Sequence, residues 1–314
     1  MFDDWKKFAK RAEKVQFHSM QKISYGRGGT LVLEMKCRGH RELIHELLHP
    51  DWLGHMKIAT WNINSVRLRI AQVLRFLKEQ QPDVLCLQET KTQDVYFPAK
   101  EIADAGLSYQ AIRGEKSYNG VAILSRLPIE NVNYQDWVGK GDCRHIVAQI
   151  SGIKIHNIYL PAGGDIPDRF ENLKFGHKLD FISEVTDYFE KNTPVKALLV
   201  GDLNVAPLVS DVWSTKQLKN VVSHTDIERK KIIDMQKKGG WADAVREFFG
   251  SEQVLYSWWS YRARNYIESD RGRRLDHIWV SIDLASKIDK VEIHKNTRGW
   301  EKPSDHVPIT LQLL

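Results

Sequence analysis

The sequence has few cysteines and no long apolar run, and each shortage argues against a class of protein. Only three cysteines occur in 314 residues, at Cys37, Cys86 and Cys143. This spacing gives no disulfide framework or paired-cysteine zinc site, and it favours a reducing compartment. No apolar stretch approaches the roughly 20 residues that cross a bilayer. The start, MFDDWKK, also lacks the pattern of a signal peptide. We therefore expect a cytoplasmic protein without membrane contact.

The overall composition is that of a globular protein with a mild basic excess. Hydrophobic residues make up 42% of the chain and charged residues 27%, which suits one large domain or two small ones. The formal net charge of +6 is compatible with a polyanionic partner but does not require one. Ten tryptophans supply either core or stacking surfaces for bases.

Residues 1–55 differ from the rest and are expected to form an extension of uncertain structure and function. Five of the twelve histidines lie in this segment. Its pattern suggests helices over 4–15 and 41–49 and a strand over 30–35. In the HELLH pattern, His45 and His49 have the spacing of the two zinc ligands on a helix of zinc proteases. Chance in a histidine-rich segment is the favoured explanation, because Pro50 ends the helix at once.

From Met56 onward, short strands and a few helices alternate in a way that predicts one catalytic domain over 56–314. Helices are expected over 68–80, 170–189 and 225–237. Strands are expected over 58–63, 83–88, 109–112, 121–125, 146–150, 154–160, 195–200, 256–259, 275–280 and 307–313. Many successive strands lack the crossover helix that a parallel pair needs. The pattern therefore predicts a four-layer α/β sandwich of two mixed, mostly antiparallel sheets flanked by helices.

Polar side chains follow several of these strands at the point where each one ends. Asp202 and Asn204 come directly after the run 195–200, and residues two apart point to the same side of a strand. Similar positions are held by Asn62, Asn64, Glu89, Tyr159, Asp276, Asp305 and His306. Each alone has an ordinary structural explanation, such as a helix cap, an ion pair or a core phenol. Together they indicate an oxygen-rich site for Mg²⁺ or Mn²⁺ beside a bound phosphate.

Seven motifs in a fixed order carry a resemblance to a known family. They are TWNINSVR at 60–67, LQETK at 87–91, YLPAGG at 159–164, LVGDLNVAP at 199–207, SWWSYR at 257–262, RRLDHIWVS at 273–281 and EKPSDHVP at 301–308. On these motifs the chain from Met56 to Leu314 resembles the exonuclease III family of abasic-site endonucleases. That family lies within the endonuclease/exonuclease/phosphatase superfamily and has a DNase I-like fold.

The resemblance implies a role for each matching residue. Asp202 would deprotonate the attacking water, Asn204 would hold it, and His306 would donate to the phosphate. Asp276 would orient that histidine, and Tyr159 would contact the phosphate. The implied ligands of Mg²⁺, with Mn²⁺ as the alternative, are Asn62, Glu89, Asp202, Asn204 and Asp305. The implied DNA contacts are Arg144, Lys174, Lys178 and Trp258, the two lysines lying one turn apart on the helix 170–189.

The implied reaction is hydrolysis of the phosphodiester 5′ to an abasic site, which leaves a 3′-hydroxyl. The same centre would remove nucleotides or blocking groups from recessed 3′ ends of double-stranded DNA, and we expect a monomer. Arg273 departs from the family, because several relatives carry an apolar or aromatic residue there. Two other hypotheses are a superfamily phosphoesterase for a non-DNA ester such as an inositol phosphate, and an inactive DNA-binding module.

Overall fold

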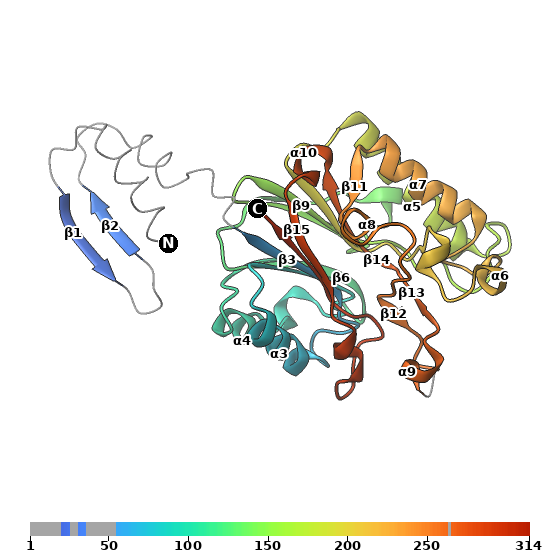
Figure 1. The fold of residues 1–314 in the computed structure, drawn as a ribbon, viewed down its shortest axis with the longest axis horizontal. Coiled ribbons are helices and arrows are strands. Elements are labelled where there is room, and N and C mark those ends of the chain that lie inside the picture. The colour runs from blue at the N-terminus through green and yellow to red at the C-terminus, as the bar shows by residue number, and fades with distance from the viewer. Residues whose placement is uncertain (1–19, 26–30, 36–54, 263–264) are drawn as a thin grey trace. The chain divides into compact units, whose positions relative to one another are not determined.

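The computed structural model describes residues 20–25, 31–35, 55–262 and 265–314 (Figure 1). The chain divides into two compact units, Met1–Trp52 and Leu53–Leu314. In the first unit, β1 (Met20–Tyr25) pairs antiparallel with β2 (Leu31–Met35), which agrees with the strand expected over 30–35. The helices expected over 4–15 and 41–49, with the HELLH pattern, lie outside the described residues.

The second unit is built on two six-stranded sheets, as predicted. The first has the order β15-β16-β3-β4-β6-β5, and only β3 and β4 run parallel. Its strands are Met56–Asn62 (β3), Val84–Gln88 (β4), Tyr109–Glu115 (β5), Tyr118–Ser125 (β6), Ile288–Ile293 (β15) and Ile309–Leu313 (β16). The second has the order β11-β14-β10-β9-β8-β7, and only β9 and β10 run parallel. Its strands are Glu130–Asn133 (β7), His145–Ile150 (β8), Ile153–Tyr159 (β9), Ala197–Asp202 (β10), Trp241–Asp243 (β11) and Asp276–Ser281 (β14).

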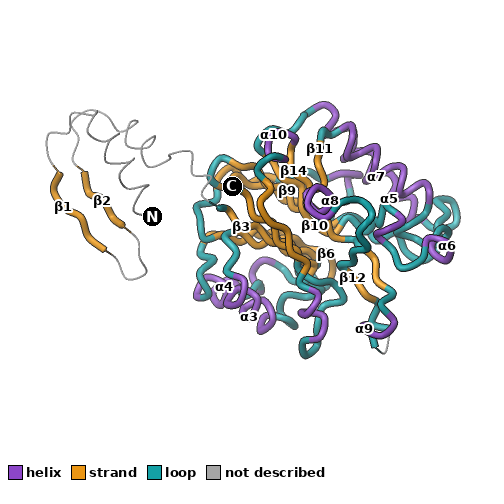
Figure 2. The backbone as a smooth tube through the Cα atoms, viewed as in Figure 1, coloured by secondary structure: helices purple, strands orange, loops and turns teal. Residues whose placement is uncertain are grey.

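Helices cover the outer face of each sheet and complete the four layers (Figure 2). The first sheet packs its apolar outer face against α3 (Ile70–Gln80) and α4 (Ala99–Asp104). The second packs against α5 (Leu173–Lys191) and α7 (Asp226–Lys238). Shorter elements include α6 (Thr215–Leu218), α8 (Ala244–Phe249), β12 (Trp258–Trp259), α9 (Tyr266–Ser269), β13 (Gly272–Arg273) and α10 (Ile282–Ala285). No helix among the described residues is long and apolar enough to span a membrane.

The space between the sheets is mostly apolar, and a buried asparagine crosses it. Residues of both sheets fill this layer, most of them isoleucine, valine, leucine and alanine. Asn157 of β9 donates from Nδ2 to the carbonyls of Leu87 and Ala122, each at 2.9 Å. Its Oδ1 accepts a hydrogen bond of 2.7 Å from Gln88 Nε2. One side chain of the second sheet therefore satisfies three polar groups of the first and fixes how the sheets face each other.

The differences from the predicted elements have local causes. The helix expected from residue 170 begins at Leu173, because the Asn172 side chain accepts from the Lys174 amide and caps it. The strands β7 and β15 were not predicted from the sequence. ENVN of β7 is polar and exposed, whereas IDKVEI of β15 mixes charged with apolar residues and is partly buried, and both strands lie at sheet edges.

We predict that Asn157→Leu lowers the free energy of unfolding by roughly 2–4 kcal/mol, because it removes buried hydrogen bonds to the Leu87 and Ala122 carbonyls and to the Gln88 side chain. Urea denaturation followed by circular dichroism measures this change. The matched control is Asn296→Leu, at an exposed position, which should stay within about 0.5 kcal/mol of the wild type. Equal stability of the two variants would contradict the role given to Asn157.

Candidate active site

The predicted catalytic residues lie together at the ends of the central strands of the two sheets. Asp202, the last residue of β10, lies opposite Tyr159 of β9 and Asp276 of β14. On the first sheet, Asn62 ends β3 beside the end of β4, and Glu89 follows directly. His306 lies just before β16, the other neighbour of β3. Strand pairing therefore brings together residues that lie up to 244 positions apart.

Asn62 links the carboxylates of the two sheets. Its Nδ2 donates to Glu89 Oε1 and to Asp202 Oδ2, each at 2.9 Å, and the side chain is fully buried. Its Oδ1 accepts from the backbone amide of Asn64 at 3.0 Å. The amide nitrogen thus faces the acids and the oxygen points elsewhere. In this arrangement Asn62 positions both carboxylates, and its predicted role as a metal ligand stays a prediction.

The Asp202–Asn204 pair is held by an unusual backbone. Asn204 donates to Asp202 Oδ1 from its backbone amide at 2.9 Å and to Asp202 Oδ2 from Nδ2 at 3.2 Å. Asn204 has a left-handed φ of 52°, a strain that asparagine tolerates better than most residues. Gly201 has a φ of 137°, and a Cβ there would lie 1.9 Å from the Ile158 carbonyl oxygen. Only glycine at position 201, directly before Asp202, therefore allows β10 to approach β9 this closely.

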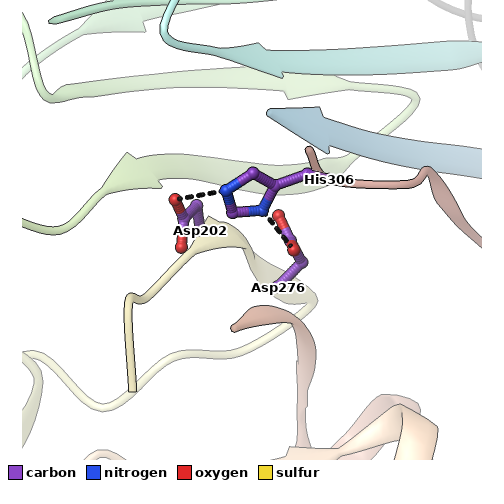
Figure 3. A group of neighbouring side chains, drawn as sticks. All are labelled: Asp202, Asp276 and His306. Carbon is purple, nitrogen blue, oxygen red and sulfur yellow. Dashed lines mark hydrogen bonds and ion pairs between the residues drawn. The ribbon is translucent and has the colours of Figure 1, made fainter. Parts of the chain in front are cut away.

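His306 lies between two acids (Figure 3). Its Nδ1 is 2.7 Å from Asp276 Oδ2, and its Nε2 is 3.7 Å from Asp202 Oδ2. Ser257 Oγ donates to the same Asp276 oxygen at 2.6 Å. Burial alone lowers the pKa of His306, but Asp276 and Asp202 outweigh it and raise the pKa to about 10. The imidazole is therefore a cation at neutral pH.

The pKa of Asp202 is also shifted, because Asp202 is a buried carboxylate near other carboxylates. Burial raises its pKa to about 7, Asp276 and Glu89 add to the rise, and His306 opposes it. A carboxylate with a pKa near neutrality accepts and releases a proton readily under working conditions. The pair of a near-neutral base and a fixed imidazolium suits attack of water on an anionic ester.

Glu89 and Asp305 supply the oxygens that could hold a divalent cation. Burial raises the pKa of Glu89, but Lys91 and Asn62 outweigh it and the net shift is downward. For Asp305, burial is likewise outweighed by His306 and by hydrogen bonds from Asn64 and Trp258. Both acids are thus ionised at neutral pH, which suits a hard cation such as Mg²⁺. Lys91 Nζ lies 2.6 Å from Glu89 Oε2, where it balances the charge.

A second acidic group, Asp202, Asp276 and His306, has ligand atoms within 4.8 Å of one another. Distance alone would allow a metal there. A protonated imidazole offers no lone pair, however, and its charge repels a cation. Glu89 and Asp305 offer ionised oxygens to a metal without any histidine ligand, although the Lys91 ammonium lies against Glu89.

Tyr159 and Arg144 form a buried unit beside the acids. Burial, together with Glu89 and Asp202, raises the pKa of the Tyr159 phenol well above its usual value, so the hydroxyl keeps its proton. The Arg144 guanidinium lies 4.9 Å from the centre of the Tyr159 ring and is 2.7 Å from Asp142 Oδ2. Arg144 is itself buried behind the phenol. Its contact with DNA stays a prediction.

The prediction that Lys178 binds DNA is wrong. Its side chain is fully buried, and Nζ donates to Glu228 Oε1 at 2.5 Å and to the Asn204 carbonyl at 2.8 Å. The sequence contained a signal against that role. Lys178 lies on the apolar face of α5 with Phe175, Leu179 and Ile182, at spacings of three and four residues. Lys174, one turn earlier, is exposed as predicted, and its contact with DNA stays a prediction.

A cavity of about 1030 Å³ opens beside the site. Glu89, Asn204, Asp305 and His306 line one part of it, together with Trp258 as the sequence suggested. Trp258 Nε1 donates to Asp305 Oδ2 at 3.0 Å, which couples the ring to the proposed metal position. Several other lining residues could not be assigned to the site from the sequence: Trp213, Val222, Ser223, Arg262 and Arg271. They come from loops whose sequence shows no periodic pattern.

Comparison with known proteins identifies the family. Residues 59–306 match the profile of the Endonuclease/Exonuclease/phosphatase family. The chain belongs to this family. Exodeoxyribonuclease III of Haemophilus influenzae is 30% identical over 277 residues, which cover 81% of this chain and 98% of the relative. The resemblance seen in the motifs is confirmed, and the protein is an enzyme of the exodeoxyribonuclease III and AP endonuclease type.

Solved structures of family members share the fold. An AP endonuclease from Archaeoglobus fulgidus superposes with a TM-score of 0.77 at 34% identity, over 82% of this chain and 99% of that one. The 3′ phosphatase NExo from Neisseria, bound to a product DNA hairpin, gives a TM-score of 0.77 at 30% identity, with the same two coverages. The predicted DNase I-like architecture is confirmed by these similarities.

We predict that Asp276→Asn lowers the pKa of His306 from about 10, because it removes the anion bonded to Nδ1. An NMR titration of the imidazole signals in the metal-free protein measures the change. The internal control is His294, whose pKa burial lowers to about 4 and which should titrate as in the wild type. An unchanged His306 titration would show that Asp276 does not keep the imidazole charged.

Proposed function

We propose that the protein is a Mg²⁺-dependent DNA-repair nuclease. It hydrolyses the phosphodiester 5′ to abasic sites and removes nucleotides or blocking groups from the 3′ ends of duplex DNA. The observation that carries the proposal is the position of Asp202, which lies between the amides of Asn62 and Asn204 and within 3.7 Å of His306. The relatives named as exodeoxyribonuclease III and AP endonuclease support DNA as the substrate.

In the proposed reaction Asp202 takes a proton from the attacking water. Asn204 uses Nδ2 to hold Asp202 and the Leu160 carbonyl, so its Oδ1 is the atom directed to that water. His306, as an imidazolium, donates to a non-bridging phosphate oxygen and stabilises the charge that develops there. Tyr159 keeps its proton and donates a hydrogen bond to the phosphate. The bond from phosphorus to O3′ breaks, and the departing oxygen becomes a 3′-hydroxyl.

The metal position proposed here uses Glu89 and Asp305. These carboxylates are ionised, partly enclosed and adjacent to the cavity. A Mg²⁺ ion held there supplies charge neutralisation for the phosphate and for the leaving oxygen. Asp202 and Asn204 were also expected to be metal ligands. They are hydrogen-bonded to each other, and we assign Asp202 the role of the base. Asn62 keeps Glu89 and Asp202 apart at a fixed spacing.

We predict that Asp202→Asn lowers kcat for incision by about 10²-fold or more, because the base is lost, whereas DNA affinity is kept. The assay uses a duplex with one abasic analogue, with and without Mg²⁺, resolved on a gel. The control is Asp187→Asn on the exposed side of α5, which should incise like the wild type. Rapid incision by Asp202→Asn would remove Asp202 from its assigned role.

The same assay separates the proposal from its alternative. A protein that cleaves an inositol phosphate and leaves every duplex intact would be the non-DNA phosphoesterase. A protein that binds the duplex but cleaves neither substrate, with Mg²⁺ present, would be an inactive binding module. Mg²⁺-dependent incision of the abasic duplex supports the nuclease against both.

We predict that removal of residues 1–55 leaves incision within about 2-fold of the full chain, because the catalytic side chains all lie after residue 55 and domains of this size fold alone. The rate is measured on the same abasic duplex. Circular dichroism confirms that the shortened chain is folded. A folded but inactive shortened chain would show that the extension contributes to catalysis.

A further inference from the structure

Arg273 is a cation fixed in the wall of the cavity. It lies on β13 directly opposite Trp258 of β12, and its guanidinium carbon is 5.2 Å from the centre of the Trp258 ring. Its Nη1 donates to the Val222 carbonyl at 3.1 Å and to Ser223 Oγ at 2.7 Å. Stacking on one side and two hydrogen bonds on one nitrogen hold the guanidinium in a single orientation.

This arginine has no anionic partner, in contrast to the residue that follows it. Arg274 is fully buried and pairs with Asp211 at 2.5 Å and with Asp243 at 2.8 Å. Among the described residues, Arg273 forms no ion pair, and its buried Nε has no hydrogen-bond partner. A largely enclosed guanidinium without a carboxylate is costly unless a bound anion completes it. The wall is thus suited to receive a negative group.

The cavity joins Arg273 to the catalytic residues. Trp258 contacts both ends: its backbone forms a bridge with His306, and its ring lies under Arg273. A volume of about 1030 Å³ is large enough for a nucleotide-sized group. A scissile phosphate at His306 leaves the part of the cavity that Arg273 lines to the group attached beyond that phosphate.

We propose that Arg273 makes the site selective for 3′ ends that carry a phosphoglycolate, whose carboxylate lies beyond the scissile phosphate, over the neutral sugar of an abasic site. The inference rests on the proposed nuclease function. The guanidinium fork matches two oxygens of a phosphate or carboxylate at once. Water adds to phosphorus, the bond to O3′ breaks, and O3′ takes a proton. The products are a 3′-hydroxyl end and free phosphoglycolate.

The test compares kcat/KM for two Mg²⁺-containing reactions, namely release of phosphoglycolate from a 3′-blocked duplex and incision of a duplex with an internal abasic analogue. Arg273→Met keeps the aliphatic stem over Trp258 and removes the charge. We expect it to lower the first rate about 10-fold or more, a loss typical of one charged contact, and to leave the second within about 3-fold. Arg273→Gln retains donors toward Val222 and Ser223. It should change the two rates in the same way as Arg273→Met, and it replaces that variant in the test if Arg273→Met does not fold.

The matched control is Arg271→Met. Arg271 also lines the cavity, but its guanidinium lies 4.7 Å from the centre of the Trp213 ring. We expect this variant to leave the ratio of the two rates unchanged. A ratio unchanged in the Arg273 variants overturns the selectivity, whether both rates stay high or fall together. If the wild type acts on neither duplex, the proposed function itself fails, which is a different result.

Discussion

The amide of Asn62 holds two carboxylates that the chain brings from different sheets. Glu89 follows β4 of the first sheet, Asp202 ends β10 of the second, and both accept a hydrogen bond from the same nitrogen. Without that donor, two buried anions would face each other in a medium that screens charge poorly. Asn157 bridges the two sheets in the core, and Asn62 bridges the two acids at the site. The spacing of the acids therefore depends on the spacing of the sheets.

Electrostatic balance extends outward from this pair. His306 gives Asp202 a positive neighbour, and Asp276 holds that cation in place from the other side. Lys178 and Glu228 form a buried ion pair below the site, and the lysine also holds the Asn204 carbonyl. An uncompensated charge at any of these positions would cost several kcal/mol. The same reasoning makes Arg273 exceptional, because its charge lacks such a partner in the described part of the chain.

Much of the fold and site could be predicted from the sequence, because strands with apolar runs end in distinctive polar residues. Asp202, Asn204 and Glu89 follow such runs, so their convergence could be inferred before any coordinates. The edge strands β7 and β15 could not be predicted, since a polar segment and a short segment of mixed polarity both resemble loops. The orientation of the Asn62 amide and the buried state of Lys178 depend on tertiary packing. For Lys178, motif spacing alone assigned a DNA contact that its buried ion pair does not fit.

The central claim is that side chains from both sheets surround one divalent ion and one phosphate. Anomalous diffraction from crystals grown with Mn²⁺ and a product duplex tests it most directly. The account predicts a peak within coordination distance of the Glu89 carboxylate, with a phosphate oxygen between the ion and His306. A peak on Asp276 and His306 instead, or a Glu89 carboxylate out of reach of the ion, would contradict it.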